Sequence, residues 1–142
     1  MNWLPKKKVI VPIDLSDESL LAIGTAIQLV ANPSHLLVVH VLQEVSTLEP
    51  TEAWHAIDKS NRIRHVSKIV RQRLDEAGYE KVLLEVLVGD PGHEIADLAA
   101  RMHTDLIVLP SHGRTGIRRL LIGSVAERVV RLAHCPVLVL RK

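Results

Sequence analysis

Lys8-Val-Ile-Val-Pro-Ile-Asp-Leu-Ser16 joins a short β-branched apolar run to a polar turn. An apolar run of this length predicts a strand that is buried on both faces, as parallel sheets require. The polar residues after Ile13 signal the start of a helix, and apolar residues recur at helical spacing from Asp17 to Val30. The stretch therefore predicts a strand followed by a helix, the unit from which α/β folds are built.

The same alternation of strand and helix continues along the chain. Further strands are predicted at residues 35–41, 81–88, 105–109 and 136–140. An amphipathic stretch over residues 54–74 predicts a helix that Gly78 ends. Another helix is predicted to start after the Asp90 cap, at Pro91, and the last one is predicted at residues 124–133. We therefore predict one domain over residues 1–142, a three-layer α/β sandwich with a five-stranded parallel sheet between its helices.

Composition narrows the class of protein. Hydrophobic residues make up 47% of the chain and are spread along it, which excludes a disordered protein. The longest uncharged apolar stretch, Leu20 to Ala31, is shorter than the roughly 20 residues of a membrane helix, so we predict no membrane partner. Met1 to Lys8 lacks the apolar region of a signal peptide, and Cys135, the only cysteine, cannot form an internal disulfide. These features predict a cytoplasmic location.

Charge and aromatic content argue against a nucleic-acid partner. The formal net charge is only +2, and both signs are mixed along the chain. Aromatic side chains are limited to Trp3, Trp54 and Tyr79. Proteins that bind single strands stack the bases on aromatic side chains, so this composition does not suit them.

The segment after the predicted strand at residues 105–109 has the features of an anion-binding loop. Ser111-His-Gly113 is followed by nine residues and then by Gly123-Ser124 at a helix start. Glycines let the backbone approach a ligand, and the free N–H groups and positive dipole end of a helix favour a phosphate. His112 is the better histidine candidate for a phosphate contact. Ser124 can cap the helix, donate to a phosphate or do both, and capping is the expected role. A loop that merely turns the chain explains the same glycines, so that alternative stays open.

A second polar loop follows the first strand. In doubly wound sheets, ligands bind beyond the carboxyl ends of the strands where the strand order reverses. The loops at Pro12 to Ser16 and Pro110 to Ser124 are therefore predicted to flank the site. Asp14 either binds ribose hydroxyls or a divalent cation, or caps the next helix. Positive charge is placed at Arg114, Arg118 and Arg119 in the second loop, and at Lys6, Lys7 and Lys8, which are expected at the opposite end of the sheet.

The sequence lacks the characteristic motifs of several enzyme classes. The chain has no G-x-x-x-x-G-K-[ST] loop and no G-x-G-x-x-G after a strand, which argues against P-loop ATPases and dinucleotide oxidoreductases. It also has no G-x-S-x-G elbow of serine hydrolases. His93-Glu94 lacks the second histidine of a zinc-binding helix, because position 97 is Asp.

Together, these segments resemble the universal stress protein family over nearly the whole chain. The resemblance rests on Val9 to Ser16, Val38 to Val41, Gly89-Asp90-Pro91, Ser111 to Gly116, Gly123 to Glu127 and Cys135 to Val139. It implies a flavodoxin-like or Rossmann-like α/β sandwich, similar to adenine nucleotide α-hydrolases. It also implies a homodimer through the last strand and a cytoplasmic role in the stress response. An apolar edge strand at Val137 to Leu140 independently predicts such pairing.

One branch of the family binds ATP through a motif of Gly, two residues, Gly, nine residues, Gly, and Ser or Thr. This sequence supplies Gly113, Gly123 and Ser124, but Pro110 occupies the first glycine position. Proline has no N–H to donate and fixes φ near −65°, so whatever the first glycine provides is lost or replaced. The rest of the motif is intact, and the resemblance favours nucleotide binding.

The resemblance also assigns roles by position. Asp14 is expected to meet the ribose or the metal, Val41 the adenine, and the two loop segments the sugar and phosphates of ATP with Mg²⁺ or Mn²⁺. The complete expected binding set is Pro12, Ile13, Asp14, Val41, Pro110, Ser111, His112, Gly113, Arg114, Thr115, Gly116, Gly123, Ser124, Val125 and Ala126.

Three functions follow from this reading. The first is an ATP-dependent regulator of the stress response that works as a homodimer. The second is a slow ATPase, although no convincing general base is present, so at most weak hydrolysis is expected. The third is a nucleotide-free dimeric module that binds an unknown protein partner, and Pro110 is the main argument for it.

Overall fold

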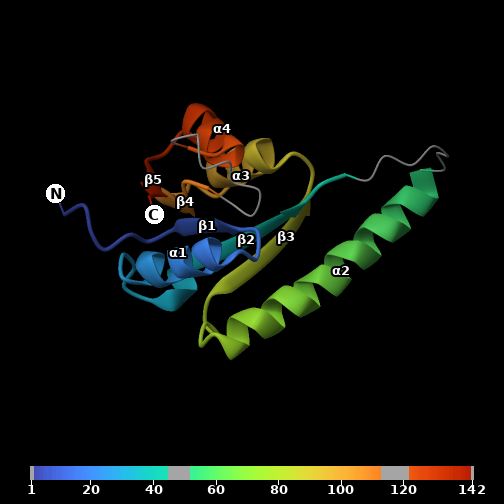
Figure 1. Ribbon diagram of the computed structural model, residues 1–142, viewed down its shortest axis with the longest axis horizontal. Coiled ribbons are helices and arrows are strands. Elements are labelled where there is room, and N and C mark those ends of the chain that lie inside the picture. Colours follow the sequence, from blue (N-terminus) through green and yellow to red (C-terminus); the bar gives the residue numbers. More distant parts are fainter. Residues whose placement is uncertain (1, 45–51, 113–121, 142) are drawn as a thin grey trace.

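A single parallel sheet forms the centre of the molecule (Figure 1). The computed structural model describes residues 2–44, 52–112 and 122–141, with the backbone alone described for residues 52–57. Its five strands lie in the order β3-β2-β1-β4-β5, which confirms the predicted parallel sheet and places β5 at an edge. The strands are β1 (Val9–Ile13), β2 (Leu36–Leu42), β3 (Leu83–Val88), β4 (Leu106–Pro110) and β5 (Val137–Leu140).

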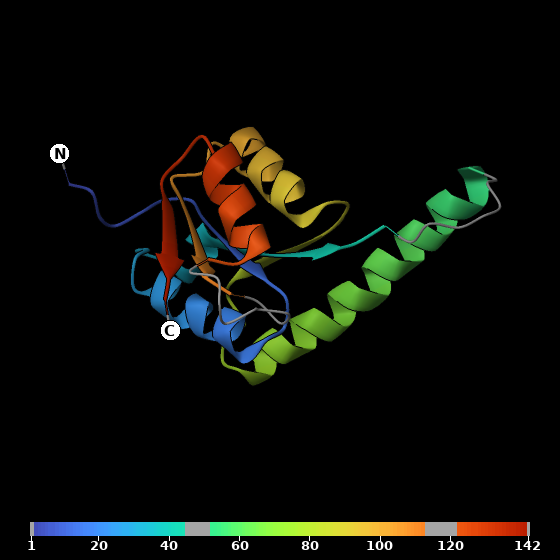
Figure 2. The ribbon, with the colours of Figure 1, turned by 45° about the horizontal axis from the view of Figure 1, so that its top comes forward.

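Helices cover both faces of the sheet (Figure 2). They are α1 (Asp17–Ile27), α2 (Glu52–Glu76), α3 (Pro91–Arg101) and α4 (Ser124–Leu132), with a short 3₁₀ helix η1 (Pro33–His35) before β2. Helices α1 and α2 pack on one face, and α3 and α4 pack on the other. The predicted three-layer α/β sandwich is therefore confirmed.

The core explains why β1 carries no polar residue. All five of its side chains are buried, because the strand lies in the middle of the sheet with helices on both sides. Val9 and Val11 pack into the core under α1 and α2, whereas Ile10 packs into the core under α3 and α4. Successive side chains of a strand point to opposite faces, so a strand between two helical layers must be apolar throughout.

Local signals determine most helix ends. The Ser16 side chain accepts from the Ser19 N–H and caps α1, and Gly78, in the left-handed region at φ 89°, follows the end of α2. Helix α1 ends at Ile27 rather than at the predicted Val30, because Val30 forms an isolated parallel β-bridge with Lys6. None of the helices in the described ranges combines the length and apolar character needed to cross a membrane.

The lysines before β1 lie at the amino ends of the strands, as predicted. The Asp105 carboxylate, just before β4, accepts from the backbone N–H groups of Lys7 and Lys8 at 3.1 and 3.0 Å. The Lys8 ammonium donates to the Met102 carbonyl oxygen at 3.0 Å. Their positive charge is therefore at the end of the sheet opposite to the loops that follow β1 and β4.

Asp90 joins α3 to α4. It caps α3 by accepting from the His93 N–H at 3.1 Å, and its other oxygen lies 2.8 Å from Nη1 of Arg128 on α4. Gly92 permits this crossing, since a Cβ there would lie 2.5 Å from Cδ of Arg128. Hydrogen bonds from the His93 side chain and backbone, with a smaller contribution from Arg128, lower the pKa of Asp90 from 3.8 to about 2.

This lowered pKa predicts a pH-dependent contribution to stability. The folded state holds the Asp90 proton more weakly than the unfolded state, so the stabilisation is present above about pH 4 and is lost as the pH falls towards about 2. Asp90→Asn keeps a capping oxygen but removes the charge. We expect urea denaturation to show a less stable variant near neutral pH and a difference that shrinks towards about pH 2. Asp97→Asn, on the exposed side of α3, is the matched control; an equal pH effect in both variants would contradict the assignment.

Candidate functional site

The two loops predicted to flank the site lie where the strand order reverses. From β1 the chain passes to β2 on one side, whereas β4 lies on the other side of β1. The chain leaves the sheet after Ile13 and after Pro110, and both strands run in the same direction. Such a reversal separates neighbouring loops and creates the crevice in which open α/β sheets bind ligands.

Two prolines end the hydrogen-bonded ladder between β1 and β4 at this point. The Asp105 N–H donates to the Lys8 carbonyl, so by alternation Pro12 of β1 also faces β4. The Ser111 N–H donates to Leu140 on β5, so the Pro110 nitrogen faces β1. Neither proline nitrogen can donate a hydrogen bond, and the pairing of β1 with β4 stops at Ile10 with Ile107. Beside the crevice, the carboxyl ends of β1 and β4 are therefore not paired with each other.

The loop after β1 is braced by short polar side chains. The Asp14 carboxylate accepts from the Ser16 N–H at 3.0 Å, and Leu15 between them is in the left-handed region at φ 67°. The N-cap of α1 is Ser16, so the alternative that Asp14 caps this helix is wrong. Asp14 is half-buried, and its carboxylate is held at the carboxyl end of β1.

Two residues outside the predicted binding set also brace this region. The buried Ser19 hydroxyl donates to the Ser16 carbonyl at 2.9 Å and lies 3.4 Å from the Asp14 nitrogen. The Ser16-x-x-Ser19 spacing was the available signal, since a polar residue three positions after an N-cap often completes the cap. His40 Nδ1 lies 2.9 Å from the Ile13 carbonyl, which only accepts, so Nδ1 carries the proton.

Val41 lies beside these groups, one residue before the end of β2. It pairs with Leu87 of β3 and packs partly against the core under α3 and α4. Because β2 neighbours β1 and runs parallel to it, the predicted adenine contact is at the same end of the sheet as Asp14.

The loop after β4 starts from a fixed point. Ser111 is buried, its N–H donates to the Leu140 carbonyl at 2.8 Å, and its carbonyl accepts from the Gly123 N–H at 2.5 Å. Its Oγ lies 3.2 Å from Nδ1 of the half-buried His112. The start of α4 is therefore tied directly to the end of β4.

Gly123, not Ser124, is the N-cap of α4. The expectation that Ser124 caps this helix is wrong, because Ser124 is already its first residue. A Cβ at Gly123 would lie 2.9 Å from the Ser111 carbonyl oxygen and 3.4 Å from the His112 Cα. The close approach of two backbone segments therefore requires glycine at the cap.

This cap leaves backbone donors available at the helix start. The first intrahelical bond runs from the Glu127 N–H to the Gly123 carbonyl, and within the described residues no side chain caps the N–H groups before it. These are the N–H groups of Ser124, Val125 and Ala126. Together with the positive end of the helix dipole, they form an anion-binding arrangement next to Ser111 and His112.

A preformed metal centre is not seen in the described parts of the chain. They contain no group of three or more His, Cys, Asp or Glu side chains that could hold a metal ion. Asp14 is a carboxylate at the same end of the sheet as the anion-binding arrangement, and a divalent cation bound to it would take its other oxygen ligands from water or a bound phosphate. The remaining predicted contacts, Gly113, Arg114, Thr115 and Gly116, lie outside the described residues, as do Arg118 and Arg119.

Comparison with known proteins gives the family. The model of the universal stress protein family matches residues 6–141. The chain belongs to this family. Universal stress protein MJ0531 of Methanocaldococcus jannaschii is 39% identical over an alignment that covers 96% of this chain and 82% of the relative.

Solved structures of the family have the same fold. Protein MJ0577 of the same archaeon superimposes with a TM-score of 0.78 at 24% identity, over 98% of both chains. A universal stress protein solved in complex with cAMP superimposes with a TM-score of 0.65 at 26% identity, over 96% of this chain and 97% of that one. The family sandwich expected from the sequence is therefore confirmed.

Proposed function

We propose that this universal stress protein binds an adenine nucleotide in the crevice between the loops after β1 and β4, with ATP and Mg²⁺ or Mn²⁺ as the physiological ligands. The observation that carries the proposal is the set of backbone N–H groups at the start of α4. No side chain of the described residues caps these backbone donors, and the Gly123 N–H ties the helix start to the Ser111 carbonyl at the strand-order reversal. A phosphate is the ligand that such donors favour. The family member solved with cAMP supports an adenine nucleotide as the source of that phosphate.

The proposed contacts follow the arrangement of the described residues. The N–H groups of Ser124, Val125 and Ala126 would bind phosphate oxygens, and His112 would add a contact beside them. Asp14 would accept from ribose hydroxyls or bind the cation that the phosphates also hold. Val41 would contact the adenine. Gly113 to Gly116 are proposed to contribute further backbone contacts.

The direct test begins with the protein as purified. Acid precipitation, followed by chromatography and mass spectrometry of the supernatant, identifies any nucleotide that copurifies. Calorimetric titration of Mg²⁺-ATP into the stripped protein then measures the affinity, and titrations with ADP, AMP and cAMP rank the ligands. Bound adenine nucleotide or saturable heat supports the proposal. An empty protein that gives no heat with any of these nucleotides contradicts it.

The biological role we propose is nucleotide-dependent regulation by a cytoplasmic homodimer. The four residues of β5 are partly exposed at the sheet edge, and within the described chain no strand pairs with its outer side. Pairing of this edge with a second copy would hide its backbone donors and acceptors. Sedimentation equilibrium with and without Mg²⁺-ATP measures both dimerisation and its dependence on nucleotide; a monomer under both conditions would contradict this part.

Pro110 distinguishes the proposal from a nucleotide-free module. Its nitrogen faces β1. Proline at this position therefore removes a hydrogen bond between two strands, and it does not remove a donor that points into the crevice. We therefore expect Pro110→Gly to change the calorimetric affinity for Mg²⁺-ATP by less than about tenfold, or 1.4 kcal/mol. A wild-type protein that binds no nucleotide and a Pro110→Gly variant that does would favour the nucleotide-free module.

A further inference from the structure

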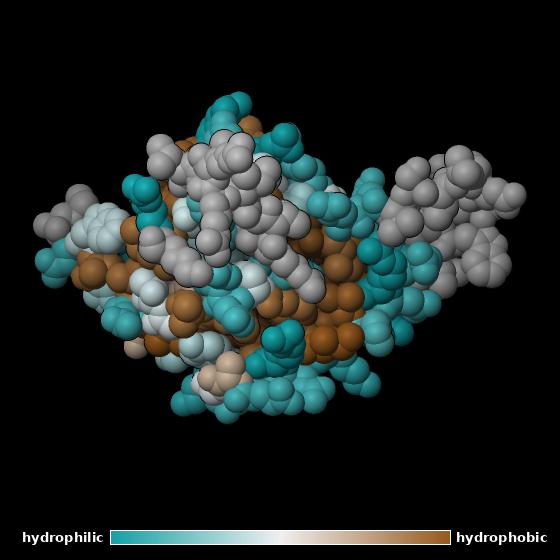
Figure 3. All heavy atoms as spheres, viewed as in Figure 1, coloured by the Kyte–Doolittle hydropathy of each residue, from teal (hydrophilic) through white to brown (hydrophobic). Residues whose placement is uncertain are grey.

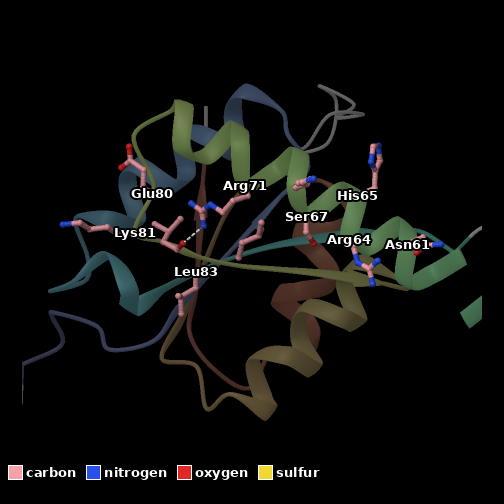
Figure 4. A pocket seen from close by; sticks show the side chains of 11 residues that line it. Asn61, Arg64, His65, Ser67, Arg71, Glu80, Lys81 and Leu83 are labelled. Carbon is pink, nitrogen blue, oxygen red and sulfur yellow. Dashed lines mark hydrogen bonds between the residues drawn. The ribbon is translucent and has the colours of Figure 1, made fainter. Parts of the chain in front are cut away.

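A groove of about 870 Å³ lies between α2 and the start of β3 (Figure 4). Val82 and Leu84, which pack into the core under α1 and α2, contribute its apolar part, and Leu83 between them points away from α2 (Figure 4). The groove runs along the outer edge of the sheet at β3, and β2 separates it from β1 and β4, whose following loops form the proposed site. It is therefore a separate surface, and what it binds does not depend on the proposed nucleotide site.

Arg71 gives the groove its shape. In Figure 4 it extends from α2 towards β3, where Nη1 donates to the Val82 carbonyl at 2.7 Å. Nη2 donates to the Tyr79 carbonyl at 2.6 Å, and Nε pairs with the Asp75 carboxylate at 2.9 Å. The guanidinium thus uses its planar set of donors to hold α2 against the turn before β3. Its charge is already balanced by Asp75.

Other cations of the groove lack such partners. Within the described ranges, the exposed side chains of Arg64, Lys68 and Lys81 form no ion pair. Of the described residues that line the groove, Glu80 alone is acidic. Hydrophilic and hydrophobic side chains lie next to one another along α2 in the space-filling view (Figure 3). The groove therefore combines an apolar floor with unbalanced positive charge, which favours an anionic occupant.

The outer edge of β3 adds a row of backbone groups. In the described chain β3 pairs only with β2. The Gly89 N–H donates to Leu42 on β2, so by alternation the backbone groups of Leu84, Val86 and Val88 face away from β2. The Arg71 bond to the Val82 carbonyl agrees with this alternation. An edge of this kind is a template for an added strand.

We propose that the groove binds an acidic extended segment of a partner protein, which pairs with the outer edge of β3. Its main chain would bond to Leu84 and Val86, its apolar side chains would cover Leu83, and its carboxylates would meet Arg64, Lys68 and Lys81. Leu83 is 50% exposed without such a partner. A single-stranded nucleic acid fits less well, since none of the described residues that line the groove is Phe, Tyr or Trp.

NMR titration of the full-length, ¹⁵N-labelled chain tests the proposal. The probe is a capped peptide of about eight residues that alternates Glu with Val or Thr, added up to about millimolar concentration. We expect saturable shifts at the amides of Leu84 and Val86, whether or not Mg²⁺-ATP is present. The double variant Arg64→Glu/Lys68→Glu should weaken binding by at least about tenfold. Lys59→Glu/Arg73→Glu changes the charge of α2 equally but lies outside the groove lining, and it should bind like wild type.

Further probes separate the contributions of main chain and charge. The same peptide N-methylated at alternate residues, on the side that would pair, should lose binding because it cannot donate to the β3 edge. A peptide with Lys in place of Glu should not bind. Absence of shifts at Leu84 and Val86, equal binding of the lysine peptide, or unchanged affinity in Arg64→Glu/Lys68→Glu would overturn the proposal. An oligothymidylate of about eight nucleotides that binds where the peptide does not would assign the groove to nucleic acid instead.

Discussion

Replacing Gly123 with valine is expected to abolish the binding of Mg²⁺-ATP while the sheet and helices remain folded. A Cβ at this position would lie 2.9 Å from the Ser111 carbonyl oxygen, closer than real Cβ contacts, and valine adds two methyl groups beyond it. The obstacle is backbone at the end of β4, which cannot rotate away as a side chain can. The start of α4 must therefore move, and its N–H groups lose their alignment with the crevice.

Calorimetry on the stripped protein measures this effect. We expect the affinity for Mg²⁺-ATP to fall by at least about 100-fold, equivalent to roughly 2.7 kcal/mol. Circular dichroism establishes whether the variant is folded, and Gly123→Ala, which adds the Cβ alone, is the milder substitution if it is not. Arg131→Ala is the matched control on the same helix, since this exposed residue pairs only with Glu127 in the described chain. Wild-type affinity in a folded Gly123→Val protein would refute the proposed phosphate site.

Replacing Ile107 with alanine is expected to produce a large loss of stability. Ile107 lies in β4 between β1 and β5, has no exposed surface, and packs in the core under α3 and α4. Deleting a buried isoleucine side chain down to Cβ removes apolar contacts and leaves a cavity that a sheet between two helical layers cannot fill by collapse. The expected cost is about 2–5 kcal/mol in the free energy of unfolding.

Urea denaturation followed by circular dichroism provides the measurement, with the m-value checked for a change in the denatured state. Leu21→Ala is the control, because Leu21 is 72% exposed on α1 and its truncation should cost less than about 0.5 kcal/mol. Similar losses in both variants would mean that Ile107 does not lie in the tightly packed centre of the sheet.

The elements were predictable wherever their signals are local. The apolar run Val9–Ile13 predicted a doubly buried strand, and the sequence Asp90-Pro91 predicted the start of α3, because each signal acts over a few residues. The sequence predictions are wrong at those helix ends that are determined by residues distant along the chain. Helix α1 stops at Ile27 because Val30 pairs with Lys6, a contact that the periodicity of the helix cannot reveal.

In the candidate site, too, local sequence predicts some features and the packing of distant segments decides others. The spacing of Gly123 and Ser124 after Ser111-His112 indicates an anion-binding loop, but the N-cap propensity of serine predicts Ser124, and not Gly123, at the cap. The cap is Gly123 because the Ser111 carbonyl approaches it, and that approach exists only when β4 and α4 are packed together. Likewise, the consequence of Pro110 depends on which neighbouring strand its nitrogen faces, which is a property of the assembled sheet.

Strand and helix order, the buried character of β1 and the family are all present in the amino-acid sequence, since periodicity, caps and motifs are properties of short segments. The tertiary structure was needed for the pairing of β1 with β4 that stops short of Pro12 and Pro110, for the start of α4 at Gly123 beside Ser111, and for the groove between α2 and β3. Each of these brings together residues that are distant along the chain. Their positions follow from the packing of helices on a common sheet, which no local pattern encodes.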